Sequence, residues 1–204
     1  CGAMCGKRFE TSWNQSRDSV DFYDIKGAVE ELLEKLGIVG YEVRAGEYLA
    51  MHPGKTAVFV KDGDVLGAAG EVHPAVQDAF GINRKVCLFE MDFELLVKHA
   101  ALISSYQQLP KFPAISRDLA VILSENVPAT AVSEAIREAG GELLTDVRLF
   151  DVYTGDPVPA GSRSLAYSLT FRSSSRTLTD DEVETHHRAI VAHLDNKIGA
   201  KLRI

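Results

Sequence analysis

The stretch SLAYSLTFR, residues 164–172, alternates strictly between large apolar side chains and small or polar ones. A period of two residues is typical of a β-strand that buries one face and exposes the other. The apolar side suits a core covered by helices and consists of Leu165, Tyr167, Leu169 and Phe171. The opposite side consists of Ser164, Ala166, Ser168, Thr170 and Arg172. The stretch therefore predicts a sheet with one buried face and one free face.

The segments before this strand predict a strand followed by a helix. Residues 117–124, RDLAVILS, carry apolar side chains toward both faces, which favours a central position in the sheet. Pro128 suits the start of a helix, and Gly140 with Gly141 suits its end. A further strand, LLTDVRLFDVYTG, then leads back toward the alternating stretch.

A second helix follows the alternating strand. Thr179 and Glu182 have the spacing of a capping box, and Gly199 is placed to end the helix. The last residues, AKLRI, predict a short strand. The order is β-α-β-β-α-β, the split βαβ arrangement of ferredoxin-like folds, in which two helices cover one face of a four-stranded sheet.

The segment LFDVYTG interrupts the alternation of its own strand. Leu149 continues the apolar positions, but Phe150 and Val152 take them up one residue out of phase. Such a shift predicts a β-bulge, a feature that redirects side chains and is frequent beside functional sites. Beyond the bulge, Asp151 and Tyr153 are expected to face away from the core together.

The first half of the chain predicts an antiparallel sheet with helices, as expected for an incomplete domain. Asp21 or Asp24 caps an amphipathic helix that ends at Gly37. Asp62 and Gly63 predict a hairpin turn. The expected strands are YEVRAG, TAVFVKDG, DVLGAAGEV and KVCLFEMDF.

The stretch SSYQQLPKFPA separates the two patterned halves and predicts a linker. We expect a first domain at residues 1–105, a linker at 106–114 and a second domain at 115–204, with an α+β fold overall. Because residue 1 is not Met, we expect the chain to be part of a longer protein.

Composition argues against several classes of function. The net charge of −7 is unlike that of a protein that binds duplexes through a basic surface. Cys1, Cys5 and Cys87 form no CxxC pair, which favours reduced thiols and no metal site. Residues 67–70, GAAG, lack the rest of a phosphate-binding loop, so a tight turn is expected there. No catalytic constellation, signal peptide or membrane-spanning run is found.

The free face of the second sheet is the best candidate site. It combines the ring of Tyr153, the carboxylate of Asp151 and several hydroxyl groups, which together suit single-stranded bases that stack on aromatic rings and are read at their edges. The alternative is an ordinary solvated face with a tyrosine at a strand end. Patterning alone leaves both interpretations open.

Several motifs, taken in order, resemble the bacterial phenylalanyl-tRNA synthetase β subunit. The second half resembles its C-terminal ferredoxin-fold anticodon-binding domain through KFPAISRDLAVIL, REAGGELLTDVRLFDVYTG, PAGSRSLAYSLTFRS and RTLTDDEV. The first half is similar to the end of the preceding synthetase-like, class II-related domain through SVDFYDIKGAVEELLEKLG, HPGKTA, LGAAGEVHPAV and FEMDFELL. The resemblance covers nearly the whole chain.

The resemblance implies roles for particular residues. Asp151 and Tyr153 match the FDxY motif of the family, which implies that Tyr153 stacks on the first anticodon base, a guanine, while Asp151 accepts hydrogen bonds from it. Ser164 matches the serine of the KSLAF segment, which reads RSLAY here, and is implied to contact a neighbouring base. We add Arg172 and Arg176 as cations that face the RNA backbone.

The resemblance also implies an assembly. The first domain is expected to be non-catalytic and to pack against an α subunit that carries the active site, in a cytoplasmic heterotetramer of two α and two β chains. ATP and Mg²⁺ are expected for the whole enzyme and no cofactor for this part of it; the other expected partner is the phenylalanine tRNA. Two alternatives are a small-molecule regulatory module, because fold alone does not fix function, and a purely structural interaction module.

Overall fold

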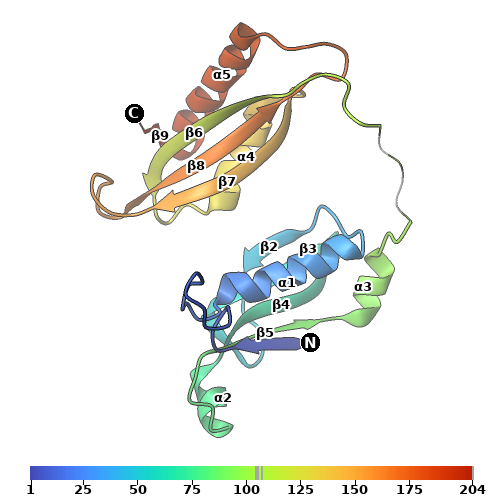
Figure 1. The fold of residues 1–204 in the computed structure, drawn as a ribbon, viewed down its shortest axis with the longest axis vertical. Coiled ribbons are helices and arrows are strands. Elements are labelled where there is room, and N and C mark those ends of the chain that lie inside the picture. Colours follow the sequence, from blue (N-terminus) through green and yellow to red (C-terminus); the bar gives the residue numbers. More distant parts are fainter. Residues whose placement is uncertain (104–105, 107, 204) are drawn as a thin grey trace. The chain divides into compact units, whose positions relative to one another are not determined.

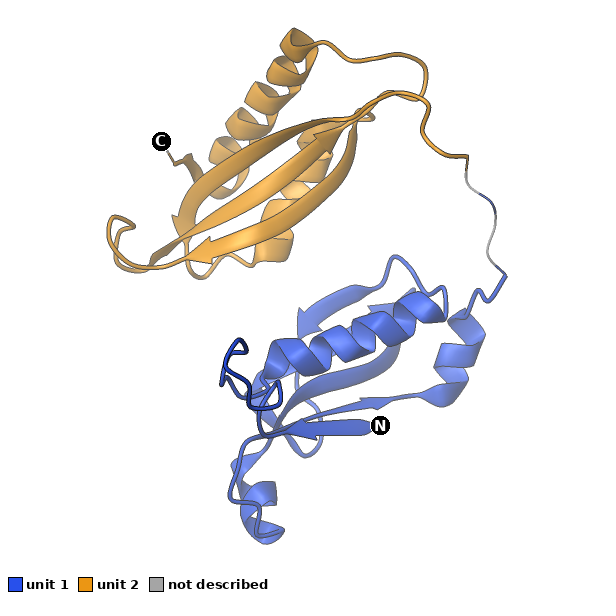
Figure 2. Cartoon of the chain, viewed as in Figure 1, with its two compact units in different colours: residues 1–106 blue, residues 107–204 orange. Residues whose placement is uncertain are grey.

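The computed structural model describes residues 1–103, 106 and 108–203. The chain divides into two compact units, residues 1–106 and 107–204 (Figure 2). Three positions of the linker stretch (104, 105 and 107) and the final residue of the expected second domain lie outside the described residues. The described positions 108–114 contain neither helix nor strand. The domain and linker bounds inferred from the sequence remain a proposal.

The second unit contains a four-stranded sheet in the order β7-β8-β6-β9. Every pair of neighbouring strands is antiparallel. The strands are β6 (Ile115–Ser124), β7 (Leu144–Tyr153), β8 (Ser162–Phe171) and β9 (Lys201–Leu202), and the helices are α4 (Ala129–Gly140) and α5 (Asp180–Ile198). The expected β-α-β-β-α-β order and the central position of β6 are confirmed.

The two helices of this unit begin and end as the sequence predicts. Thr179 accepts a hydrogen bond from the backbone N–H of Glu182, whose side chain bonds back to the backbone of Thr179, which completes the capping box of α5. Gly199 ends α5 in the left-handed conformation, with a φ of 66°. Pro128 precedes α4 and Gly141 follows it.

Both helices lie on the same face of the sheet (Figure 1). Their apolar stripes pack against the large side chains of β8 and form the core of the unit. The most deeply buried members include Leu119, Ile136, Leu165, Tyr167, Leu169, Phe171 and Ile190. The alternation in SLAYSLTFR therefore separates a covered face from an uncovered one.

The first unit contains a five-stranded antiparallel sheet in the order β1-β5-β4-β3-β2, with α1 packed against one face (Figure 1). The strands are β1 (Gly2–Cys5), β2 (Glu42–Ala45), β3 (Met51–Lys61), β4 (Asp64–Val72) and β5 (Val86–Met91). The helices are α1 (Phe22–Lys35), α2 (Pro74–Ala79) and α3 (Phe93–His99). The expected α+β fold with an antiparallel first sheet is confirmed.

Two local signals in this unit are confirmed. Asp21 is the N-cap of α1 and Asp24 completes a capping box with it. Asp62 and Gly63 join β3 to β4 with positive φ angles of 51° and 90°, as a two-residue hairpin of this kind requires.

Two sequence-based expectations were wrong. The GAAG segment is not a turn but lies inside β4. A Cβ on Gly67 would lie 2.2 Å from the backbone oxygen of Glu90, so glycine is needed there for close approach of two strands. The strand expected to reach Phe93 ends at Met91, because Asp92 caps α3 by accepting a hydrogen bond from Leu95.

Candidate nucleic-acid interface

The predicted bulge lies in β7 at Phe150. Leu149 is paired with Tyr167 and Asp151 with Ala166, so Phe150 has no partner position on β8. Leu149 therefore shares the covered face with Tyr167. One residue has been added to β7, and Asp151 consequently lies on the uncovered face with Ala166.

Three of the expected site residues meet at one end of this uncovered face. Tyr153 is directly opposite Ser164 across the β7–β8 pair, and Asp151 lies two residues back along β7, opposite Ala166. Side chains directly opposite each other in an antiparallel pair have Cβ atoms about 5 Å apart, and diagonal neighbours about 7–8 Å. The phenol, the carboxylate and the hydroxyl group thus form one cluster.

Arg203, which follows β9, joins this cluster from the other edge of the sheet. Its backbone N–H donates to the carbonyl oxygen of Ala120, 2.9 Å away, which continues the β6–β9 pairing. Its guanidinium carbon lies 5.4 Å from the centroid of the Tyr153 ring, within the range of a cation–π contact. Nη1 of Arg203 also donates to Oγ of Ser164 at 3.3 Å. Because β7 and β9 are the two edge strands, this side chain reaches across the uncovered face.

Two side chains of the cluster are exposed to solvent and the third is buried. Tyr153 is 38% exposed, and its hydroxyl donates to the carbonyl oxygen of Asp156 at 2.7 Å, which holds the ring in place. Asp151 is exposed and makes no ion pair within the described part of the chain. Ser164, in contrast, is only 2% exposed, and its hydroxyl group accepts a hydrogen bond from Arg203.

The two other expected cations do not belong to this cluster. Arg172 follows β8, eight residues after Ser164, which corresponds to about 26 Å along an extended strand. Arg176 makes a bidentate pair with Glu182, with distances of 2.8 Å and 2.6 Å. Hydrogen bonds from Arg176, and then from Thr179, lower the pKa of the Glu182 carboxyl group to about 2. Arg176 is therefore engaged at the start of α5.

Two family models match the chain. The ferredoxin-fold anticodon binding domain matches residues 110–203, and the phenylalanyl tRNA synthetase beta chain CLM domain matches residues 1–93. The chain belongs to the phenylalanyl-tRNA synthetase β-chain family. Its uncovered sheet face thus lies in an anticodon-binding domain, and its first unit corresponds to the CLM domain.

Curated relatives agree with this assignment. The chain is similar to the proteins named phenylalanine–tRNA ligase beta subunit from Syntrophotalea carbinolica (39% identity over all of this chain), Moorella thermoacetica (44% over 94% of it) and Clostridium tetani (42% over 90% of it). The matched regions are 25%, 24% and 23% of those relatives. The chain therefore spans about a quarter of the length of the relatives that it matches.

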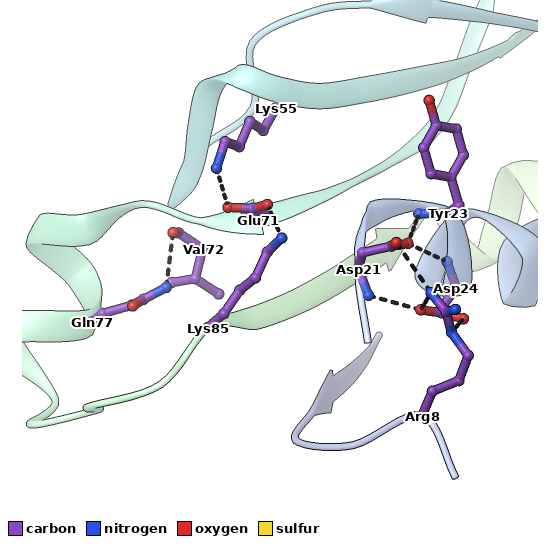
Figure 3. Close-up of polar contacts among 9 residues, drawn as sticks. All are labelled: Arg8, Asp21, Tyr23, Asp24, Lys55, Glu71, Val72, Gln77 and Lys85. Carbon is purple, nitrogen blue, oxygen red and sulfur yellow. Dashed lines mark hydrogen bonds and ion pairs between the residues drawn. The ribbon is translucent and has the colours of Figure 1, made fainter. Parts of the chain in front are cut away.

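The CLM domain contains a second group of charged side chains (Figure 3). The carboxylate of Glu71 lies between the ammonium groups of Lys55 and Lys85, at 2.7 Å and 2.5 Å. Burial alone would raise the pKa of Glu71, but the hydrogen bonds from the two lysines outweigh this effect and lower it. One carboxylate shared by two ammonium groups leaves one excess positive charge, and the short contacts are typical of a structural ion-pair cluster.

The other charged contacts in Figure 3 stabilise the start of α1. Arg8 donates to both oxygens of Asp24, at 2.8 Å and 3.0 Å, and to Asp21 at 3.1 Å. Its hydrogen bond is the largest cause of the lowered pKa of Asp24.

In the described residues, no group of three or more His, Cys, Asp or Glu side chains is placed to hold a metal ion. Both domains are non-catalytic parts of the β-chain family.

No helix among the described residues of this β-chain segment has the length and apolar character needed to cross a membrane.

Arg203 is the one member of the anticodon-domain cluster that sequence reasoning missed. The strand AKLRI was predicted, and the period of two places Lys201 and Arg203 on the same face of it. The sequence does not show whether this is the covered or the uncovered face of the sheet. That depends on the register of β9 against β6, in which Val121 pairs with Leu202 and Ile122 with Lys201.

Proposed function

We propose that the anticodon-binding domain reads the first anticodon base of the phenylalanine tRNA, a guanine, at the end of its uncovered sheet face. The observation that supports this most is the bulge at Phe150, which directs Asp151 and Tyr153 to the same face opposite Ser164 and Ala166. The exposed ring of Tyr153 offers a base a stacking surface. The carboxylate of Asp151 accepts hydrogen bonds only, which suits the N1–H and 2-amino donors of guanine.

Arg203 extends the stacking surface and gives Ser164 an indirect role. A guanidinium plane stacks on bases as an aromatic ring does, so the ring of Tyr153 and the Arg203 side chain above it form one platform. The hydroxyl group of Ser164 is buried under that side chain and anchors it. In this proposal Ser164 acts on the RNA mainly by positioning Arg203.

The activity of the whole enzyme belongs to a larger assembly. We propose that this chain serves a cytoplasmic heterotetramer of two α and two β chains that attaches phenylalanine to its tRNA with ATP and Mg²⁺, and that the CLM domain packs against the α subunit. We expect the ATP and Mg²⁺ sites to lie outside this chain; among the described residues, no group of three or more His, Cys, Asp or Glu side chains is placed to hold a metal ion. The reaction itself would take place on the α subunit.

Base reading is tested by titrating the chain with an RNA stem-loop that carries the anticodon GAA. Replacing the first guanine by inosine removes only the 2-amino donor, and replacing it by adenine also removes the N1–H donor. We expect affinity to fall from guanine to inosine to adenine, by about 1–3 kcal/mol in total. Asp151→Asn, which keeps the shape of the side chain, should reduce the differences between the three RNAs. Equal binding of all three RNAs by the unmodified chain would contradict the proposal.

The positioning role of Ser164 is tested by a double-mutant cycle. We expect Ser164→Ala and Arg203→Ala each to weaken binding of the GAA stem-loop, and the double variant to be little weaker than Arg203→Ala alone. The reason is that residues acting through one contact show non-additive effects, of about 0.5–3 kcal/mol. Affinity of all four chains is measured by fluorescence anisotropy. Strict additivity would indicate that Ser164 contacts the RNA independently.

A further inference from the structure

A polar groove lies in the anticodon-binding domain at the opposite end of β8 from the base-reading cluster. It has a volume of about 660 Å³. Its polar lining includes Lys111, Glu142, Arg172 and three consecutive serines, Ser173, Ser174 and Ser175. With Gln108 and Thr145, the lining residues carry two cations, four hydroxyl groups, one amide and one carboxylate, and no role in base reading involves them.

The cations of this groove are not neutralised by ion pairs within the described residues. Arg172 is fixed at its backbone, where its N–H donates to the carbonyl oxygen of Leu143 at 2.8 Å. Its side-chain Nε is buried and has no hydrogen-bond partner in the described part of the chain. A buried donor without a partner is costly, and such a group is satisfied by an ordered water or by a bound ligand. Lys111 is exposed at the same groove.

The serine loop supplies further donors. Oγ of Ser173 accepts a hydrogen bond from the backbone N–H of Ser175 and lies 3.2 Å from its Oγ, so the loop is folded on itself. A guanidinium group, an ammonium group and hydroxyl groups converging on one groove are the donor set typical of phosphate sites, because phosphate oxygens only accept hydrogen bonds.

We propose that this groove binds a backbone phosphate in the stem of the same RNA hairpin whose loop is read at Tyr153, an inference that rests on the proposed function. Both sites lie along β8, about 26 Å apart. A stacked strand advances about 3.4 Å per nucleotide, so this separation corresponds to roughly eight nucleotides. A triplet is too short to span it, and the phosphate therefore belongs to the stem.

Glu142 sets the selectivity of the groove. The negative charge of its carboxylate partly offsets the two positive charges, so a single free phosphate ion gains little free energy by binding there. An RNA that is already held at the other end of β8, in contrast, places its phosphate in the groove at high effective concentration. The groove thus extends the contact with RNA without giving the domain a strongly basic surface.

The test compares Lys111→Gln, Arg172→Gln and the double variant with the unmodified 204-residue chain. Binding of the GAA stem-loop is measured at several salt concentrations. We expect the slope of log K against log salt to fall by about one for each cation removed, and the loss to be the same whichever base stands first in the anticodon. Glu142→Gln should strengthen binding. Arg188→Gln serves as a matched control, because that exposed arginine lies on α5, on the covered side of the sheet.

A second RNA, which contains the loop without its paired stem, separates the two sites. The double variant should bind this loop as well as the unmodified chain does, whereas its affinity for the stem-loop should be lower. An unchanged salt slope in the double variant, or an equal loss of affinity for the loop alone, would overturn the groove proposal while base reading stands. Loss of base preference in the unmodified chain, with the salt slopes as expected, would instead overturn base reading alone.

Discussion

Replacing Tyr153 with Ala is expected to weaken binding of the GAA stem-loop by about 1–3 kcal/mol, or roughly five- to 150-fold. The variant removes the exposed ring on which the first base is proposed to stack, and it also removes the partner of the Arg203 guanidinium group. Because stacking depends on the ring face and not on the base edge, the loss of affinity should be similar for stem-loops whose anticodon begins with guanine and for those whose anticodon begins with inosine. Affinity is measured by titration at fixed salt.

Tyr153→Phe is the matched control for this result. It keeps the ring and removes only the hydroxyl group that donates to the carbonyl oxygen of Asp156. We expect it to retain most of the affinity, since an exposed hydrogen bond contributes about 1 kcal/mol or less. A Tyr153→Ala chain that stays folded and binds the stem-loop with full affinity would rule out stacking at this position.

Phe171→Ala is expected to destabilise the anticodon-binding domain by about 3–5 kcal/mol. The ring of Phe171 is fully buried in the core between the sheet and its helices, and its removal leaves a cavity. A small domain has only about 5–15 kcal/mol of net stability, so this single change removes a large fraction of it. Urea unfolding followed by hydrogen exchange at the amides of β6, β7 and β8 would report on this domain specifically.

The matched control here is Phe150→Ala in the same domain. Phe150 is 51% exposed at the bulge, and its truncation should cost less than about 1 kcal/mol. Comparable destabilisation by the two variants would mean that the bulge, and not the helix-covered core, limits the stability of the domain.

Local signals in the sequence were sufficient for most elements of the second domain. The capping box of Thr179 and Glu182, the glycine at 199 and the alternation in SLAYSLTFR each depend on a few neighbouring residues, and the structure has all three as predicted. The bulge at Phe150 was also predictable, because one extra residue in a strand shifts every later side chain to the opposite face and so leaves a visible change of apolar phase.

The features that sequence reasoning missed depend on contacts distant in the chain. The position of Arg203 over Tyr153 requires the register of β9 against β6, which a two-residue strand does not encode by itself. The pair between Arg176 and Glu182 was overlooked because Glu182 was considered only as a helix cap. The strand DVLGAAGEV was predicted correctly, but the turn expected at its GAAG segment was wrong, because Gly67 serves a close approach to β5 that depends on residues distant in the chain.

The unpaired residue of β7 has a consequence for how related chains are compared. Substituting Phe150 leaves the phase of the strand intact, but deleting its codon would return Asp151 and Tyr153 to the covered side and turn Val152 outward. An alignment that opens a one-residue gap at this position would therefore describe a domain of unchanged topology whose recognition residues face the helix-covered side of the sheet. For this strand, length carries as much functional information as residue identity.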